Sequence, residues 1–178
     1  MQNVLQNKGE LIPFSREKRP TLSELRELPG LIQVPLEENT LACSKVSGGI
    51  PRGAITEIAH SNGSGRTQVF LQLLREHPPL RAAWVERELS LNPAALPLEG
   101  IDVDRLFFVE GGDHLLWSTQ QLLRSQLFPI VVLERGQKSF SDQDLRRLQI
   151  LAHQGNTALL LMSERPMLRA SWVFRRKA

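Results

Sequence analysis

The stretch GAITEIAHSNGSGRTQVFLQLLREH, residues 53–77, decides the fold because it joins a strand pattern, a glycine-containing loop and a helix pattern. Residues 53–59 read as a strand. Residues 65–77 place apolar side chains at helical spacing on one inward face: Val69, Phe70, Leu73 and Leu74. A strand that leads through such a loop into a helix is the local context of a phosphate-binding site in α/β proteins.

The loop comes close to the phosphate-binding pattern G-x-x-x-x-G-K-[ST]. His60 replaces the first glycine, and Arg66 replaces the lysine. The wide planar guanidinium of an arginine does not approach a transferring phosphoryl group as the compact ammonium of a lysine does. Backbone N–H groups of such a loop converge on an anion. Three interpretations stay open: a plain strand-to-helix turn, a weak or vestigial nucleotide site, and a working ATPase. The candidate nucleotide-binding residues are Gly63, Ser64, Gly65, Arg66 and Thr67.

A working site also needs an acid at the end of a central strand to hold magnesium. The predicted strand 128–134 has Leu133 where that acid is expected and Glu134 one place later, a shift that would turn Glu134 away from the loop. An active enzyme would use Thr67 and Glu134 as metal ligands and Glu88 as general base. Otherwise the chain has no catalytic residue and no metal ligand, and it requires no cofactor, with weak binding of ATP and Mg²⁺ left open.

The rest of the chain alternates strands and helices, which predicts an α/β fold with a doubly wound, mainly parallel sheet. Asp113 is the expected cap of a helix over 113–126, and Ser141 with Asp144 forms a capping box for a helix over 141–155. Trp117 is expected in the core of the domain, and a role as an anchor for a partner stays open as the alternative. Further strands are predicted at 81–87, 104–111, 128–134, 157–163 and 171–176.

Length and composition indicate a globular protein of 178 residues with a net charge of +3. Neither a long apolar run nor a signal peptide is apparent, and the single cysteine suits a reducing compartment, so we expect a cytoplasmic protein without membrane contact. Residues 1–40 read as an N-terminal arm with a short helix over 21–29. Residues 41–178 read as the core domain.

Longer segments resemble the core of RecA-type recombinases. VSGGIPRGAITEIAHSNGSGRTQVFLQLL (46–74) resembles its phosphate loop, and AWVERELSLNPAALPLEGIDVDRLFFVEG (83–111) resembles the part that follows, with Glu88 on the catalytic glutamate. The resemblance covers about residues 40–163. The loop lysine and the magnesium acid are missing, and only 15 residues follow Ser163, too few for the DNA-binding loop and C-terminal domain. The resemblance therefore implies a truncated RecA-like fold.

A closer resemblance is to the ImuA family of RecA-like proteins, carried by PRGAITEI, GIDVDRLFFVEGGDHLLWSTQQLLRSQ and DLRRLQILAHQGNTALLLMSERP. It implies a non-catalytic accessory role in SOS-response translesion synthesis beside an ImuB-like relative of Y-family polymerases. Two further candidate partners are RecA and a damage-tolerant replicative-type polymerase. Weak DNA contact through basic residues such as Arg146 and Arg147 and assembly into a homo-oligomer also stay open. Two alternatives stay open: a weak ATP-binding switch or ATPase in DNA repair, and a SulA-like inhibitor of the division protein FtsZ.

Overall fold

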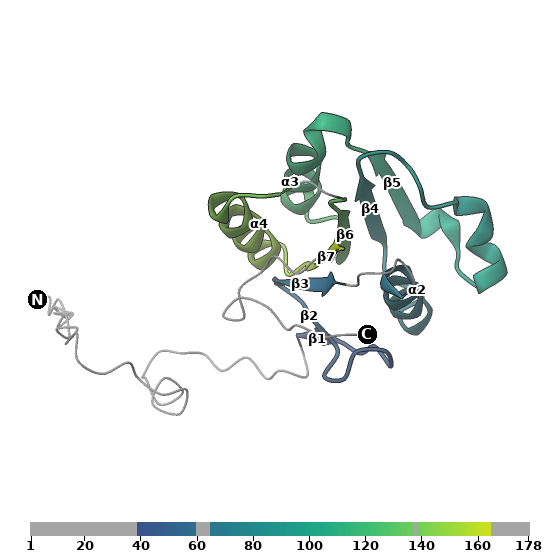
Figure 1. Cartoon of the computed structure of the whole chain (residues 1–178). Helices are drawn as coiled ribbons and strands as arrows, with labels where there is room; N and C mark the ends of the chain where they lie inside the picture. The colour runs from purple at the N-terminus through teal and green to yellow at the C-terminus, as the bar shows by residue number, and fades with distance from the viewer. Residues whose placement is uncertain (1–38, 60–64, 137–138, 165–178) are drawn as a thin grey trace, which may run out of the picture. The chain divides into compact units, whose positions relative to one another are not determined.

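The core of the protein is a five-stranded sheet in which every neighbouring pair of strands is parallel (Figure 1). The computed structural model describes residues 39–59, 65–136 and 139–164. The strands follow the spatial order β3 (Ala54–Ala59), β7 (Ala158–Ser163), β6 (Ile130–Glu134), β4 (Ala82–Glu86) and β5 (Leu106–Glu110). Each lies within the segment that the sequence predicts, so the parallel α/β sheet is confirmed.

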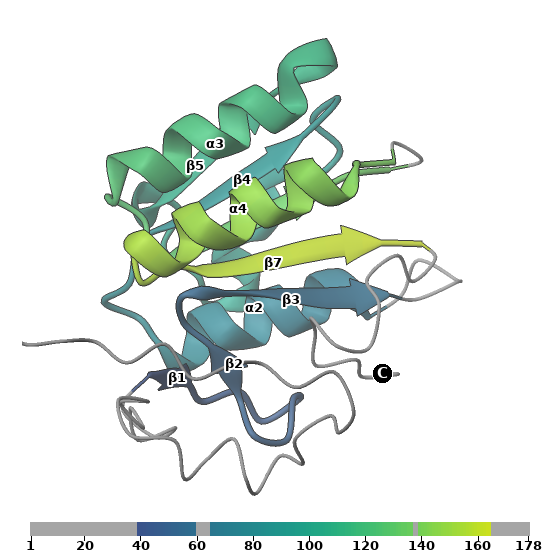
Figure 2. The same ribbon diagram turned by 90° about the vertical axis from the view of Figure 1, so that its left-hand side faces the viewer.

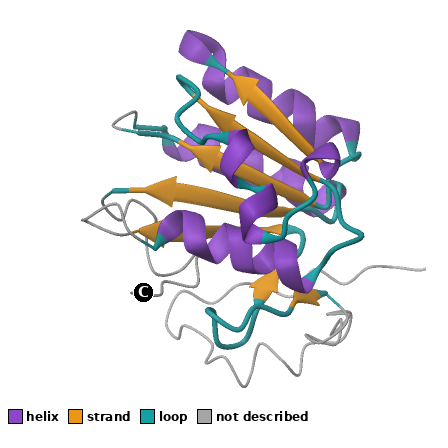
Figure 3. Ribbon diagram, turned by 90° about the vertical axis from the view of Figure 1, so that its right-hand side faces the viewer, coloured by secondary structure: helices purple, strands orange, loops and turns teal. Residues whose placement is uncertain are grey.

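Helices cover both faces of this sheet, as a doubly wound fold requires. Helix α2 (Arg66–Glu76) packs on one face, and α3 (Leu115–Ser125) and α4 (Asp142–Gln154) pack on the other, in front of the sheet in Figure 2 and behind it in Figure 3. Two hydrophobic clusters result, one on each side. The α2 cluster contains Phe70 and Trp84, whose ring centroids are 5.0 Å apart. Trp84 is thus a core residue.

The central strands are buried on both faces, which explains their continuous apolar runs. In β6, Ile130 and Val132 join the α2 cluster, whereas Val131 and Leu133 join the cluster under α3 and α4. This alternation follows from the two-residue period of a strand. It also determines which strand-end side chains face the loop that precedes α2.

The helix ends match the sequence prediction in α4 and differ from it in α3. The Ser141 side chain accepts from the Asp144 backbone, and the Asp144 side chain accepts from the Ser141 backbone, so the predicted capping box of α4 is confirmed. The cap predicted for α3 is wrong. Asp113 lies in a 3-10 turn, η4 (Gly112–His114), and α3 begins only at Leu115. Instead, Oδ1 of the exposed Asp113 side chain lies 3.5 Å from Nη2 of Arg87.

The connection from β4 to β5 is a chain of three 3-10 turns: η1 (Pro93–Ala95), η2 (Pro97–Glu99) and η3 (Val103–Arg105). The Asn92 side chain accepts from the Ala94 backbone and so caps the first of them. Before β3, two short strands, β1 (Thr40–Leu41) and β2 (Ile50–Pro51), form an antiparallel pair that the sequence did not predict. The predicted helix 21–29 and strand 171–176 lie outside the described residues. No helix in the described ranges is both long and apolar enough to cross a membrane.

Candidate functional site

The candidate site lies at the carboxyl ends of the strands, where α/β proteins place their ligands. Gly65 is the residue before α2 and has a φ of 129°, a backbone conformation that glycine adopts without steric cost. Arg66 and Thr67 form the first positions of the helix, as the phosphate-loop pattern predicts. Gly63 and Ser64, the other predicted loop residues, lie outside the described residues.

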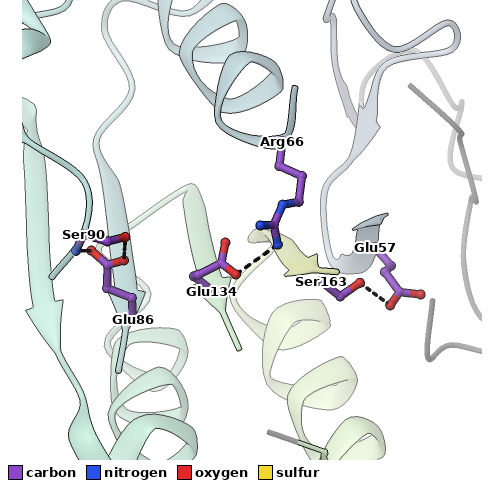
Figure 4. A network of polar contacts seen from close by, with 6 residues as sticks. All are labelled: Glu57, Arg66, Glu86, Ser90, Glu134 and Ser163. Atoms are coloured by element: carbon purple, nitrogen blue, oxygen red, sulfur yellow. Dashed lines mark hydrogen bonds and ion pairs between the residues drawn. The ribbon is translucent and has the colours of Figure 1, made fainter. Parts of the chain in front are cut away.

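Arg66 is paired with an acid of the protein itself. Its Nη1 donates to Oε1 of Glu134 at 3.1 Å, and the two side chains are 13% and 20% exposed (Figure 4). A guanidinium held by an internal carboxylate has already satisfied much of its preference for an anion. The contact uses one of the five N–H donors of the guanidinium, and Nε of Arg66 has no hydrogen-bond partner among the described residues.

The position of Glu134 corrects the expectation that its side chain turns away from the loop. Leu133 packs beneath α3 and α4, whereas Glu134 follows the parity of Ile130 and Val132 and faces α2. Glu134, and not Leu133, is therefore the residue on the α2 side of the sheet. Side chains alternate along the strand as expected, but the prediction assigned Leu133 and Glu134 to the wrong faces.

The surroundings of Glu134 change the pKa of its carboxyl in opposite directions. Burial raises the pKa of the Glu134 carboxyl above its ordinary value, and the Arg66 guanidinium acts in the opposite direction, as does the backbone N–H of Gly136. The carboxylates of Glu86 and Glu164 add to the increase. The Arg66 guanidinium thus opposes, without cancelling, the increase that burial causes in the pKa of Glu134.

Glu86, the acid at the end of β4, is hydrogen-bonded to the loop that follows this strand. Glu86 is buried, and its carboxylate accepts from the Ser90 backbone N–H at 2.8 Å, the Ser90 hydroxyl at 2.7 Å and the Leu91 backbone N–H at 3.3 Å. Glu88, the predicted general base, is exposed. No contact in the structure joins Glu88 to Arg66 or Glu134. The predicted general base is therefore not in contact with the described residues of the site.

A third acid, Glu57 in β3, was not predicted as part of the site. It is buried, and its Oε1 accepts from the hydroxyl of Ser163 at the end of β7, at 2.7 Å. Figure 4 shows the three acids in a row across the strand ends, each with a partner from the protein. The one sequence signal was the charged residue in an otherwise apolar strand, AITEIA, because such an acid must be paired when it is buried.

The described residues do not fit magnesium-bound ATP. Magnesium prefers oxygen ligands such as a carboxylate together with phosphate oxygens and waters. The acid that faces the loop, Glu134, is held by Arg66, and Glu57 and Glu86 are hydrogen-bonded elsewhere. Among the described residues, no group of three or more His, Cys, Asp or Glu side chains is arranged to hold a metal ion. These polar contacts join α2 to β6 through Arg66 and Glu134, and β7 to β3 through Ser163 and Glu57.

Comparison with known proteins finds sequence similarity to RecA proteins. No protein-family model matches the chain. RecA from Symbiobacterium thermophilum is 36% identical over 91 residues, which is 49% of this chain and 26% of that protein. RecA from Aquifex pyrophilus is 27% identical over 155 residues, which is 74% of this chain and 44% of that protein. The chain therefore spans less than half the length of these relatives.

Among solved structures, the RadB recombinase has a similar fold, with a TM-score of 0.54 at 18% sequence identity over 65% of this chain and 63% of RadB. That likeness concerns the fold, and the similarity to RecA concerns the sequence. The parallel sheet and the helices on both of its faces are the part of the chain that this fold likeness concerns. In sequence and in fold, the chain is RecA-like.

Proposed function

We propose that this protein is a non-catalytic, RecA-like accessory protein of the SOS response that supports error-prone translesion DNA synthesis through contacts with an ImuB-like polymerase relative. The observation that carries the non-catalytic part is the Arg66–Glu134 ion pair, which occupies the cation of the loop. The exposed position of Glu88, away from that pair, supports the same conclusion. The sequence resemblance to the ImuA family supports the choice of pathway and partner.

The effect of Glu88→Gln on damage-induced mutagenesis in cells tests the non-catalytic role. If no phosphoryl chemistry takes place, Glu88→Gln leaves damage-induced mutagenesis within about twofold of the wild-type level, because an exposed side chain that activates no water is dispensable. A deletion strain gives the reference for complete loss. If Glu88→Gln behaves like the deletion while the protein level is unchanged, the chain is an enzyme and the proposal is wrong.

Co-purification tests the proposed partner. The full chain, co-expressed with a tagged ImuB-like protein from the same genome, is expected to elute with it at equal stoichiometry, with or without added nucleotide. The tagged protein alone, shown by circular dichroism to be folded, is the control. Separate elution of two folded proteins contradicts the partnership and leaves the RecA-like fold unaffected.

A further inference from the structure

Strand β5 forms one edge of the sheet, and in the described part of the chain only β4 pairs with it (Figure 1). The N–H of Gly111 donates to the carbonyl at the end of β4 at 2.7 Å. Because strand backbone groups alternate in direction, those of Phe107 and Val109 face β4 as well, whereas those of Phe108 and Glu110 face away. Among the described residues, no hydrogen bond takes up these outward groups.

The edge strand at the other end of the sheet, β3, has backbone groups that a side chain takes up. Gln149 of α4 accepts from the backbone N–H of Ile55 at 3.1 Å and donates to the carbonyl of Gly53 at 3.0 Å. Proteins protect edge strands in such ways because unpaired backbone groups recruit other chains. No described side chain does the same for β5, so β5 is the edge that can accept a further strand.

The side chains of β5 add apolar surface to this edge. Leu106 and Phe108 pack against the α2 cluster but stay partly exposed. Phe107 is 51% exposed, although its ring stacks on that of Phe128 with the centroids 5.7 Å apart. Trp117 of α3, which the sequence predicts in the core, is also exposed, at 61%, but a helix offers no free backbone edge. A strand beside β5 places its own side chains directly against these apolar groups.

The charges at the two ends of β5 indicate which kind of strand fits. Asp104, just before the strand, and Glu110, its last residue, are exposed and form no ion pair with a described residue. The guanidinium of Arg105 is turned toward the carbonyls at the end of α2. The exposed Arg81 precedes β4, the next strand inward. An extended segment with a basic residue at each end and apolar residues between them complements such an edge.

We propose that β5 binds an extended segment of a partner protein as an additional strand, with one lysine or arginine beside Asp104 and another beside Glu110. Backbone hydrogen bonds supply the affinity, and the two acids and Phe107 select the side chains. Nucleic acid does not suit this edge, because its phosphates would meet two carboxylates. The proposal is independent of the function proposed above.

Hydrogen exchange of single backbone amides tests this proposal in the full chain, labelled with ¹⁵N. The probe is a synthetic peptide as long as residues 104–110, with valines at alternate positions and a lysine at each end. It is expected to slow exchange of the Phe108 amide by about tenfold or more, because an outward N–H becomes hydrogen-bonded. The amides of Phe107 and Val109 already face β4, so their exchange should change little.

Charge reversal tests the selectivity. Asp104→Lys combined with Glu110→Lys should weaken binding of the lysine peptide by about tenfold or more and favour a twin peptide with a glutamate at each end. Asp142→Lys is the matched control, because Asp142 is an exposed acid in the first turn of α4, and it should bind like wild type. Unchanged melting shows that the variants are folded. A lysine peptide with methylated backbone nitrogens keeps its charge but should leave the Phe108 amide unprotected.

Three results overturn the proposal. The first is a Phe108 amide that stays unprotected at millimolar lysine peptide. The second is equal binding of the methylated peptide, or a preference of the charge-reversed variant for the lysine peptide. The third is protection of Phe108 in the free chain that grows with protein concentration, because a second copy and not a partner would then pair with β5.

Discussion

Arg105→Ala is expected to lower the free energy of unfolding by about 2–4 kcal/mol, since it removes a half-buried guanidinium that donates to several backbone carbonyls. Arg105 lies at the end of η3, and its guanidinium reaches across to the C-terminus of α2. Nη2 donates to the carbonyl of Leu74 at 2.6 Å, and Nη1 donates to those of His77, Pro78 and Leu80 at 2.8, 2.9 and 3.3 Å. Leu74 lies in the last turn of α2, whose carbonyls have no partner within the helix, and the other three carbonyls belong to the segment that follows the helix.

The position of Arg105 adds a favourable charge interaction to the hydrogen bonds. A cation at a helix C-terminus is stabilised by the helix dipole. Burial lowers the pKa of Arg105 from its ordinary value, yet the guanidinium stays charged at any physiological pH. Arg105→Lys should recover only part of the loss, because one ammonium cannot reach carbonyls in two directions.

Urea denaturation of wild type, Arg105→Ala and Arg81→Ala measures this effect. Arg81 is exposed and has no hydrogen bond or ion pair to a described residue, so its replacement removes the same side chain without the same contacts. Arg81→Ala should change the free energy of unfolding by less than about 0.5 kcal/mol. Equal effects of the two substitutions would show that the carbonyl contacts of Arg105 contribute nothing.

Arg66→Ala is expected to lower the free energy of unfolding by about 1–3 kcal/mol, because it leaves the Glu134 carboxylate partly buried without its cation. Breaking a fully buried ion pair from one side costs about 3–5 kcal/mol, and the remaining exposure of both side chains, 13% and 20%, reduces that cost through solvent screening. Arg66→Met combined with Glu134→Leu should recover most of the loss, since an apolar pair removes both desolvated charges.

A double-mutant cycle over Arg66 and Glu134 makes the comparison quantitative. We expect a coupling energy of about 1 kcal/mol or more, which falls as salt is added. A coupling energy of zero would mean that the 3.1 Å contact between Arg66 and Glu134 is not a stabilising unit. The loop would then have a free cation, and the structural role of the pair would have to be abandoned.

The strands and the α4 cap were predictable from sequence because their signals are local. A continuous apolar run such as Ile130–Leu133 indicates a strand covered on both faces, and the Ser141–Asp144 spacing indicates a helix start without reference to the rest of the chain. The loop before α2 was recognisable for the same reason. Gly65, Arg66 and Thr67 lie where a strand–loop–helix pattern places them.

The features that escaped prediction depend on contacts between distant residues. Glu134 meets Arg66 across 68 positions, and Ser163 meets Glu57 across 106, so neither pairing is visible in a local pattern. Trp117 was assigned to the core because it is apolar, but the sheet-facing side of α3 includes Thr119, whose hydroxyl donates to the Leu115 carbonyl at 2.8 Å and needs no external partner. Packing geometry, and not hydrophobicity alone, selected the buried face.

Asp113 illustrates a third kind of limit. An aspartate before an apolar helical run is a good cap signal, yet the chain first turns through Gly111 and Gly112. A Cβ on Gly111 would lie 2.8 Å from the Cα of Leu115, so the tight approach requires glycine there. The turn moves Asp113 out of the capping position.

The most direct test of the central claim, that Glu134 holds the Arg66 guanidinium and that the protein takes no nucleotide there, is an equilibrium titration of the full chain with a fluorescent ATP analogue and Mg²⁺. The account predicts no saturable binding up to millimolar nucleotide, and no rise in melting temperature with MgATP, because a ligand that binds the native state would stabilise it. Saturable binding in the micromolar range that disappears in Arg66→Ala would contradict the account and would make the chain a nucleotide-binding protein.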